Sequence, residues 1–182
     1  KEIPITGWKI TSVMSGRTAT LGKGVYLPYS GQVNPEQAIF AKGGDRIIIQ
    51  TSRSPIGYSF RVNTCTGYFE QFQDFNPSLP LECPRPIDER LPSSPNALND
   101  KCLDYIQNIP QCSIVSQTLP LDTKPECSSY VGENVNYPKC VEKHKNDKNF
   151  YKNEWRVFLN YEDALWKQQR ELIKLTDQNG AI

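Results

Sequence analysis

The stretch AKGGDRIIIQT, residues 41–51, decides the fold class that the sequence predicts. Gly43, Gly44 and Asp45 are residue types that favour a tight turn. Three isoleucines follow at once at 47–49, and a β-branched run of this kind is typical of a buried β-strand. The stretch therefore predicts a turn that leads into a strand of a β-sheet core.

The segments before this strand have the same character. In EIPITGWKITSV, residues 2–13, apolar residues are separated by polar ones, and Gly7 interrupts the alternation as a bend or bulge would. In TATLGKGVYLP, residues 18–28, Gly22 and Gly24 mark turns. We therefore expect residues 1–60 to consist of short strands.

The C-terminal segment, residues 151–182, also predicts strands. NEWRVFLN, residues 153–160, alternates apolar and polar positions, and ELIKLTDQNGAI, residues 171–182, leads from a strand into an Asn179–Gly180 turn and the start of a return strand. Trp8 and Trp155 alternate with other apolar residues, so we expect them in the core rather than on a sugar-binding surface. Trp166 has no such pattern.

The middle of the chain, residues 61–150, is of a different kind. It holds all six cysteines and ten of the 14 prolines, and the alternation of apolar residues disappears. Strands of residues 1–60 and 151–182 must then pair across it. The sequence therefore predicts one domain over 1–182, a β-sandwich that carries a cysteine-rich insertion at 61–150.

Two short helices are predicted within the insertion. LNDKCLDYIQNIPQC, residues 98–112, has Asn99 or Asp100 as a helix cap and Pro110 as a stop. PKCVEKHKND, residues 138–147, starts a second helix with Pro138. CTGYFEQF, residues 65–72, could form one helical turn, and loops connect the rest.

The cysteines are even in number, and none forms a Cys-x-x-Cys pair. We interpret them as three disulfides formed in an oxidising compartment, the alternative being buried free thiols in a cytosolic protein. Their pairing is open, because six cysteines combine in many ways. A hairpin of the two helices favours Cys65–Cys83 with the nested pairs Cys102–Cys140 and Cys112–Cys127, and the local alternative is Cys102–Cys112 with Cys127–Cys140.

Three motifs in this order resemble the lamin tail domain family. They are Gly7–Trp8 at the end of an apolar strand, Gly44–Asp45 before the isoleucines at 47–49, and Asp177 to Gly180 in a final turn. They cover residues 1–55 and 154–182, about half of the chain. The insertion departs from the animal pattern and resembles a cysteine-rich bacterial variant. The resemblance implies an immunoglobulin-like β-sandwich with a binding or structural role and no catalytic residues to carry over.

Composition limits the classes of function. The chain carries 21 basic and 20 acidic residues, a net charge of +1 that gives no long-range attraction to nucleic acid or to anionic membranes. No apolar run approaches the roughly 20 residues that a membrane-spanning helix needs. The chain opens on a strand and stops after a turn, so we expect a piece of a longer protein whose export signals or anchors lie outside it.

Cys140 and His144 are four residues apart on a predicted helix, which would suit a metal ion or a thiol nucleophile with its base. His144 is the one histidine of the sequence, and close cysteine pairs are missing. We therefore expect a disulfide-bonded Cys140, a solvent-facing His144 and neither a metal site nor a cofactor. No Gly-rich phosphate loop occurs, and acidic pairs such as Glu162–Asp163 do not by themselves define a catalytic pair.

A basic and aromatic segment is the one candidate binding surface. Aromatic and lysine side chains interleave in it and could contact an anionic polymer or a protein, although a solvated helix face has the same composition. Its candidate residues are Tyr137, Lys139, Lys143, Lys145, Lys148, Tyr151 and Lys152.

From these features we predict a non-catalytic interaction or structural module outside the cell or on its surface, with a protein or a cell-wall glycan as partner. The first alternative is a nucleic-acid-associated module that accompanies other domains. The second is an enzyme whose site lies in the insertion.

Overall fold

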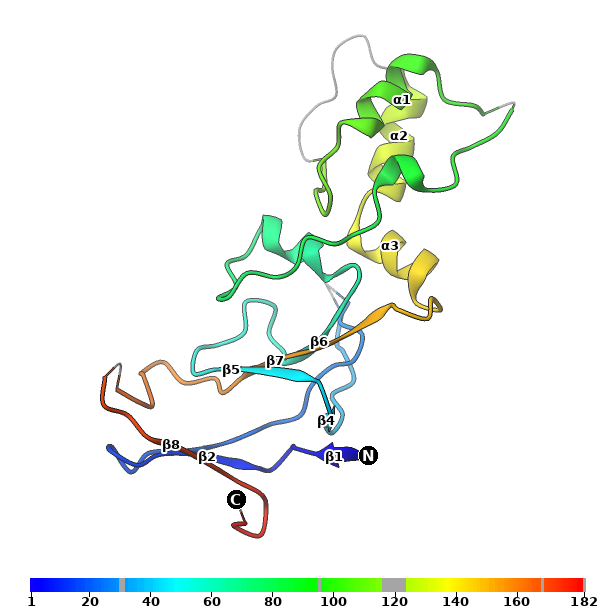
Figure 1. The fold of residues 1–182 in the computed structure, drawn as a ribbon. Coiled ribbons are helices and arrows are strands. Elements are labelled where there is room, and N and C mark those ends of the chain that lie inside the picture. The colour runs from blue at the N-terminus through cyan, green and yellow to red at the C-terminus, as the bar shows by residue number, and fades with distance from the viewer. Residues whose placement is uncertain (30–31, 95, 116–123, 168, 182) are drawn as a thin grey trace. The chain divides into compact units, whose positions relative to one another are not determined.

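The computed structural model describes residues 1–29, 32–94, 96–115, 124–167 and 169–181 (Figure 1). The chain divides into two compact units. Lys1–Val62 and Tyr151–Ile182 form the first, which we call the β unit, and Asn63–Phe150 forms the second, the cysteine unit. The cysteine unit therefore nearly coincides with the insertion predicted at residues 61–150.

Eight strands, counted over the described residues, form three small sheets. β1 (Glu2–Pro4) pairs with β4 (Phe40–Lys42); β2 (Lys9–Ser12) lies between β3 (Thr18–Thr20) and β8 (Ile173–Thr176); and β7 (Tyr151–Phe158) lies between β5 (Arg46–Gln50) and β6 (Phe60–Asn63).

Strands from the two ends of the chain pair with each other, as predicted. β2 and β8 are antiparallel, with Ile10 opposite Leu175. β5 and β7 are parallel, with Ile47 opposite Trp155. The prediction of short strands that bracket a disulfide-bonded, partly helical segment is therefore confirmed, but sheets of two or three strands do not make a clear immunoglobulin-like sandwich.

The core of the β unit is built around Trp155, whose side chain is fully buried. Trp8 and Trp166 are partly buried against the same cluster. The prediction that Trp8 and Trp155 lie in the core is therefore confirmed for Trp155 and partly confirmed for Trp8. The other buried members of the cluster are Ile5, Ile10, Ala19, Leu21, Ile39, Val157, Leu159 and Leu165.

The isoleucines at 47–49 are half-buried, so the prediction of a buried strand is confirmed only in part. β5 is the edge strand of its sheet, with β7 as its one neighbour. An edge strand lacks cover on one side. Ile47 and Ile49 still pack against the core cluster, which accounts for their apolar character.

Glu171 ties the closing segment to the opening one. Its carboxylate accepts hydrogen bonds from the hydroxyl of Ser12 at 2.8 Å and from the backbone N–H groups of Lys167 and Leu172, each at 2.9 Å. Ser12 is a buried polar residue, with 1% of its surface exposed. These contacts extend the β2–β8 pairing beyond the strands themselves.

The predicted Asn179–Gly180 turn is confirmed. Gly180 has a φ of +84°, a conformation that glycine adopts without steric cost, and its N–H donates to the carbonyl of Asp177 at 3.1 Å. The N–H of Asp177 donates in turn to the carbonyl of Ala181 at 2.9 Å. Ala181, where a return strand was expected to start, is not in a strand, and Ile182 lies outside the described residues.

The cysteine unit has three α-helices and two 3-10 helices in its described part, in the chain order η1 (Thr66–Gln71), η2 (Pro86–Asp88), α1 (Asp100–Gln107), α2 (Pro125–Asn134) and α3 (Tyr137–His144). The predicted helical turn at 65–72 and both predicted helices are present. Asn99 caps α1 through its side chain, which accepts the N–H of Cys102. Asn136 caps α3 by accepting the N–H of Lys139, so α3 begins one residue before the predicted start at Pro138.

The helix α2 was not predicted. It begins with Pro125 at its first position, and its buried residues Cys127 and Val131 are four apart, with the buried Val135 following at the same spacing. That spacing is the helical signal that the sequence contained. Ser128, Ser129 and Gly132 weaken it because they have low helix propensity.

Three disulfides join all six cysteines: Cys65–Cys140, Cys83–Cys112 and Cys102–Cys127. The prediction of three bridges is confirmed. The predicted pairs Cys65–Cys83, Cys102–Cys140 and Cys112–Cys127 are wrong, as are the local alternatives Cys102–Cys112 and Cys127–Cys140.

The helix α2 explains the error in pairing. Cys102 and Ile106 of α1 share one buried cluster with Cys127 and Val131 of α2, so the helical pair is α1 with α2 rather than α1 with α3. Cys140 of α3 is then left for Cys65, which directly precedes η1.

Candidate functional site

The residues of the predicted basic and aromatic surface are divided between the two units. Five of its residues lie in the cysteine unit, on α3 and the turn after it, whereas Tyr151 and Lys152 begin β7 in the β unit. Tyr151 is partly exposed, and the guanidinium carbon of Arg61 lies 5.6 Å from the centre of its ring. Burial raises the pKa of this phenol.

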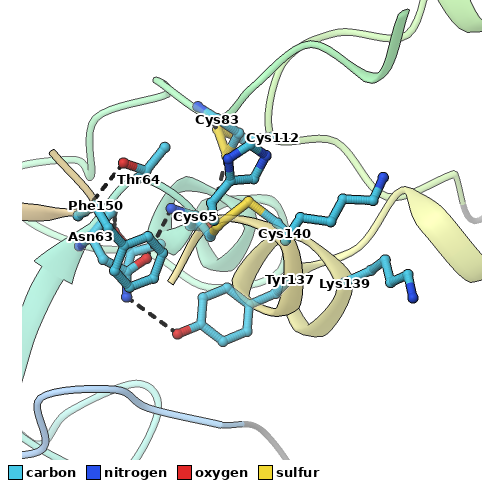
Figure 2. Close-up of a disulfide and its surroundings, with 12 residues drawn as sticks. Asn63, Thr64, Cys65, Cys83, Cys112, Tyr137, Lys139, Cys140 and Phe150 are labelled. Carbon is cyan, nitrogen blue, oxygen red and sulfur yellow. Dashed lines mark hydrogen bonds between the residues drawn. A yellow bond between two sulfur atoms is a disulfide. The ribbon is translucent and has the colours of Figure 1, made fainter. Parts of the chain in front are cut away.

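Tyr137 is buried, with 2% of its surface exposed, and its predicted place on a binding surface is wrong. Its ring packs against Phe69 of η1 at a centroid distance of 4.4 Å. Its hydroxyl accepts a hydrogen bond from the side-chain amide of Asn63 at 3.4 Å (Figure 2). The residue follows the helix cap directly and anchors α3 to η1.

The four lysines differ in their surroundings. Lys139 pairs with Glu142 at 2.8 Å, and Lys143 pairs with Glu89 at 3.3 Å. Lys145 and Lys148 are exposed, and neither makes an ion pair with any residue that the structure describes. In the described part of the cysteine unit, Lys145 and Lys148 are therefore the lysines of this surface that make no salt bridge, and Lys145 still acts electrostatically on Glu142.

A cluster of covalent and hydrogen bonds joins the two ends of the cysteine unit (Figure 2). The Cys65–Cys140 bridge joins η1 to α3. The side-chain oxygen of Asn63 accepts the N–H of Cys65 at 2.8 Å, and the N–H of Thr64 donates to the carbonyl of Phe150, also at 2.8 Å. The two ends of the unit are thereby held side by side by covalent and hydrogen bonds.

His144 is held between two carboxylates. Its Nε2 lies 2.7 Å from Glu89 and its Nδ1 lies 2.7 Å from Asp147. Partial burial works against the charged form, but the hydrogen bonds with Asp147 and Glu89 outweigh it, and the pKa of His144 is raised above its usual 6.5. With 21% of its side chain exposed, His144 faces solvent only in part, and the expectation holds only to that extent.

These contacts limit the chemistry of the Cys140 and His144 pair. The sulfur of Cys140 is bonded to Cys65, so it is neither a thiolate nucleophile nor a metal ligand. Both imidazole nitrogens have carboxylate partners, so neither is free for a substrate proton. The arrangement stabilises an imidazolium ion and links α3 to the segment after η2.

Glu89 also influences two tyrosines. Burial and, to a smaller extent, the Glu89 carboxylate raise the pKa of Tyr68 to about 12. The same two causes raise the pKa of Tyr130. Both shifts favour the neutral, protonated phenol.

A hollow of about 710 Å³ in the cysteine unit lies between the segment that leads into α1 and the helix α2. Its walls include Asn96 and Asn99 before and at the cap of α1, and Tyr130 and Glu133 on α2. The sequence analysis did not identify this hollow, because one of its walls is the helix that was not predicted.

A second, apolar hollow of about 200 Å³ lies in the β unit. Its lining residues are Ile3, Ile5, Trp8, Leu21, Ala41, Ile47, Ile49 and Leu175. It continues the core cluster outward and contains no polar side chain that could orient a ligand.

Over the described ranges no group of three or more metal-ligating side chains is close enough to hold an ion. No helix in these ranges combines the length and the apolar character required to cross a membrane. Comparison with known proteins gives no match to a protein family, to a curated protein or to a solved structure.

Proposed function

We propose that the chain is a non-catalytic interaction module of lamin-tail type that works outside the cell or on its surface. The β unit is the scaffold, and the cysteine unit provides the binding surface. The observation that carries the proposal is the pairing of all six cysteines within the cysteine unit. Stable disulfides of this number fit an oxidising compartment.

The lamin-tail assignment is supported by backbone conformation at the residues of the resemblance. Gly7, Gly44 and Gly180 have φ values of +87°, +92° and +84°. Residues with a side chain rarely adopt this region, so each glycine is matched to its turn. The first motif directly precedes β2 and the last directly follows β8, and these two strands pair with each other.

A binding role is supported over a catalytic one by the state of the reactive side chains. The cysteines are bonded to one another, and both nitrogens of His144 are engaged. The cysteine unit instead presents loops and short helices whose conformation is stabilised by three disulfide bonds. Loops supported by a rigid framework are common sites of recognition.

The proposal is tested by the thiol content and the binding of the exported protein. Alkylation without reductant, followed by mass spectrometry, is expected to label no cysteine. The exported protein is also expected to bind a cell-wall preparation or a surface-protein fraction, and to lose this binding after reduction. Six labelled cysteines in freshly exported material would reject the proposal.

A nucleic-acid role is the second candidate, and it is favoured by the exposed Lys145 and Lys148 alone. Binding through phosphates weakens steeply as salt rises. Titration of duplex and single-stranded DNA at a low and a high salt concentration decides the case. Absence of affinity at low salt removes this candidate and leaves the first in place.

A further inference from the structure

A disulfide bond forms part of the lining of the hollow between α1 and α2. Cys102 and Cys127 are each the third residue of their helix, and the bridge between them lines the hollow. Behind the bridge lie Ile106 and Val131, both buried. The volume of about 710 Å³ falls in the range of preformed ligand pockets. The disulfide thus holds the two walls in place before any ligand arrives.

The polar groups around the hollow both donate and accept hydrogen bonds. Asn96 contributes an amide and Ser129 a hydroxyl. The amide nitrogen of Asn134 donates to the carbonyl of Tyr130 at 2.9 Å, which leaves its side-chain oxygen as an acceptor. Such a mixture of donors and acceptors matches a ligand that carries many hydroxyl groups.

An aromatic and apolar strip accompanies these polar groups. The ring of Tyr130 is half-buried on one wall, and Leu98 and Pro92 contribute apolar surface near it. A tyrosine side chain combines a flat apolar face with a polar tip. It therefore suits a sugar ring, whose C–H face is apolar and whose rim carries hydroxyl groups.

The charge of the hollow argues against anionic ligands. Glu126 and Glu133 line it together with a single cation, Lys124. None of the three makes an ion pair with another residue in the described part of the chain. The resulting charge of −1 repels phosphates and acidic polymers, which require positive surfaces.

We propose that the hollow between α1 and α2 is a binding site for a neutral oligosaccharide, with Tyr130 as the stacking platform and the neighbouring amides and carboxylates as hydrogen-bond partners. The inference rests on the proposed function and deepens it, because it selects a glycan over a protein as the partner of the cysteine unit.

The test is a titration of the whole, disulfide-bonded protein with chitohexaose, cellohexaose and maltohexaose, followed by calorimetry. At least one of these probes is expected to bind. Tyr130→Ala is expected to weaken that binding by about tenfold or more, a factor that corresponds to roughly 1.4 kcal/mol. Glu133→Ala changes an exposed residue of the wall, and a smaller loss of affinity is expected for it.

Tyr105→Ala is the matched control. Tyr105 is also half-buried against the α1–α2 cluster, but it lines a different hollow. The Tyr105→Ala variant is expected to bind the probes with the same affinity as the natural sequence. Thermal unfolding of all three variants identifies any that fail to fold. If Tyr130→Ala fails to fold, Glu133→Ala still tests the site.

Two results overturn the inference. One is that no neutral saccharide binds, and the other is that Tyr130→Ala and Glu133→Ala bind as tightly as the control. If the protein still binds cell-wall or surface-protein fractions in these cases, the proposed function stands and only the assignment of the hollow fails. If the fractions do not bind either, both fail.

Discussion

Gly67 is the residue on which the packing of η1 most directly depends. A Cβ atom at this position would contact Cys112 Sγ and would lie 2.7 Å from the backbone carbonyl oxygen of Pro80. Cys112 is fixed by its bridge to Cys83, and a backbone oxygen cannot rotate away. Gly67 has no space for a side chain, and this lack of a side chain lets η1 pack directly against the Cys83–Cys112 disulfide.

Gly67→Ala is expected to lower the free energy of unfolding by about 1–3 kcal/mol, the cost of overpacking a well-filled core. Urea unfolding of the oxidised protein measures the change. Gly132→Ala is the matched control, because a Cβ at Gly132 meets nothing within 4 Å and alanine favours the helix α2. The control is expected to raise stability by about 0.5–1 kcal/mol. Equal effects of the two substitutions would contradict the packing described for η1.

At the scale of elements, α3 is held by contacts at both ends. Tyr137 and Cys140 attach its first turns to η1, through ring packing and a disulfide. His144 and Lys143 attach its last turn to Glu89, which follows η2. The second attachment depends on charge, so it responds to pH.

His144 makes this dependence measurable. Its pKa is raised in the folded protein, so its protonated form contributes stability that is complete below the unfolded value, near 6.5, and is lost as pH rises through the folded pKa. Glu89 and Asp147 are the charged groups that contact its ring, and Lys143 forms an ion pair with the same Glu89. We expect the urea midpoint to fall as pH increases from slightly acidic to alkaline. His144→Gln is expected to flatten this slope, and an unchanged slope in the variant would show that His144 does not carry it.

At the scale of the whole molecule, covalent bonds are concentrated in one part of the chain. All three disulfides belong to the cysteine unit, whereas the β unit is held by strand pairing and an apolar core. Cys65–Cys140 spans 75 residues of sequence and encloses the other two bridges. A bridge of this kind restricts the unfolded chain over most of the unit.

Replacing Cys65 and Cys140 by serine together is therefore expected to cost about 2–5 kcal/mol of stability, the usual effect of removing a native disulfide. Urea unfolding gives the value, and mass spectrometry verifies that Cys83–Cys112 and Cys102–Cys127 remain formed. A double variant that unfolds at the same urea concentration as the natural sequence would show that the hydrogen bonds between the two ends of the cysteine unit suffice without the bridge.

Local patterns in the sequence were sufficient for much of this architecture. The turn residues before the isoleucines at 47–49 predicted β5, Asn99 predicted the start of α1, and the even number of cysteines predicted three bridges. Each of these features depends on neighbours along the chain or on composition, so the sequence contains the relevant physics directly.

The sequence by itself thus predicted most of the local elements, though not α2, as well as the bracketing of a cysteine-rich segment by strands and the presence of three disulfides. Only the tertiary structure decided which cysteines pair, that Tyr137 is buried against Phe69, that His144 lies between Glu89 and Asp147, and that a hollow opens beside α2. These features join residues far apart in the chain. Their energies depend on how helices pack against one another, and that packing leaves little trace in any short stretch of sequence.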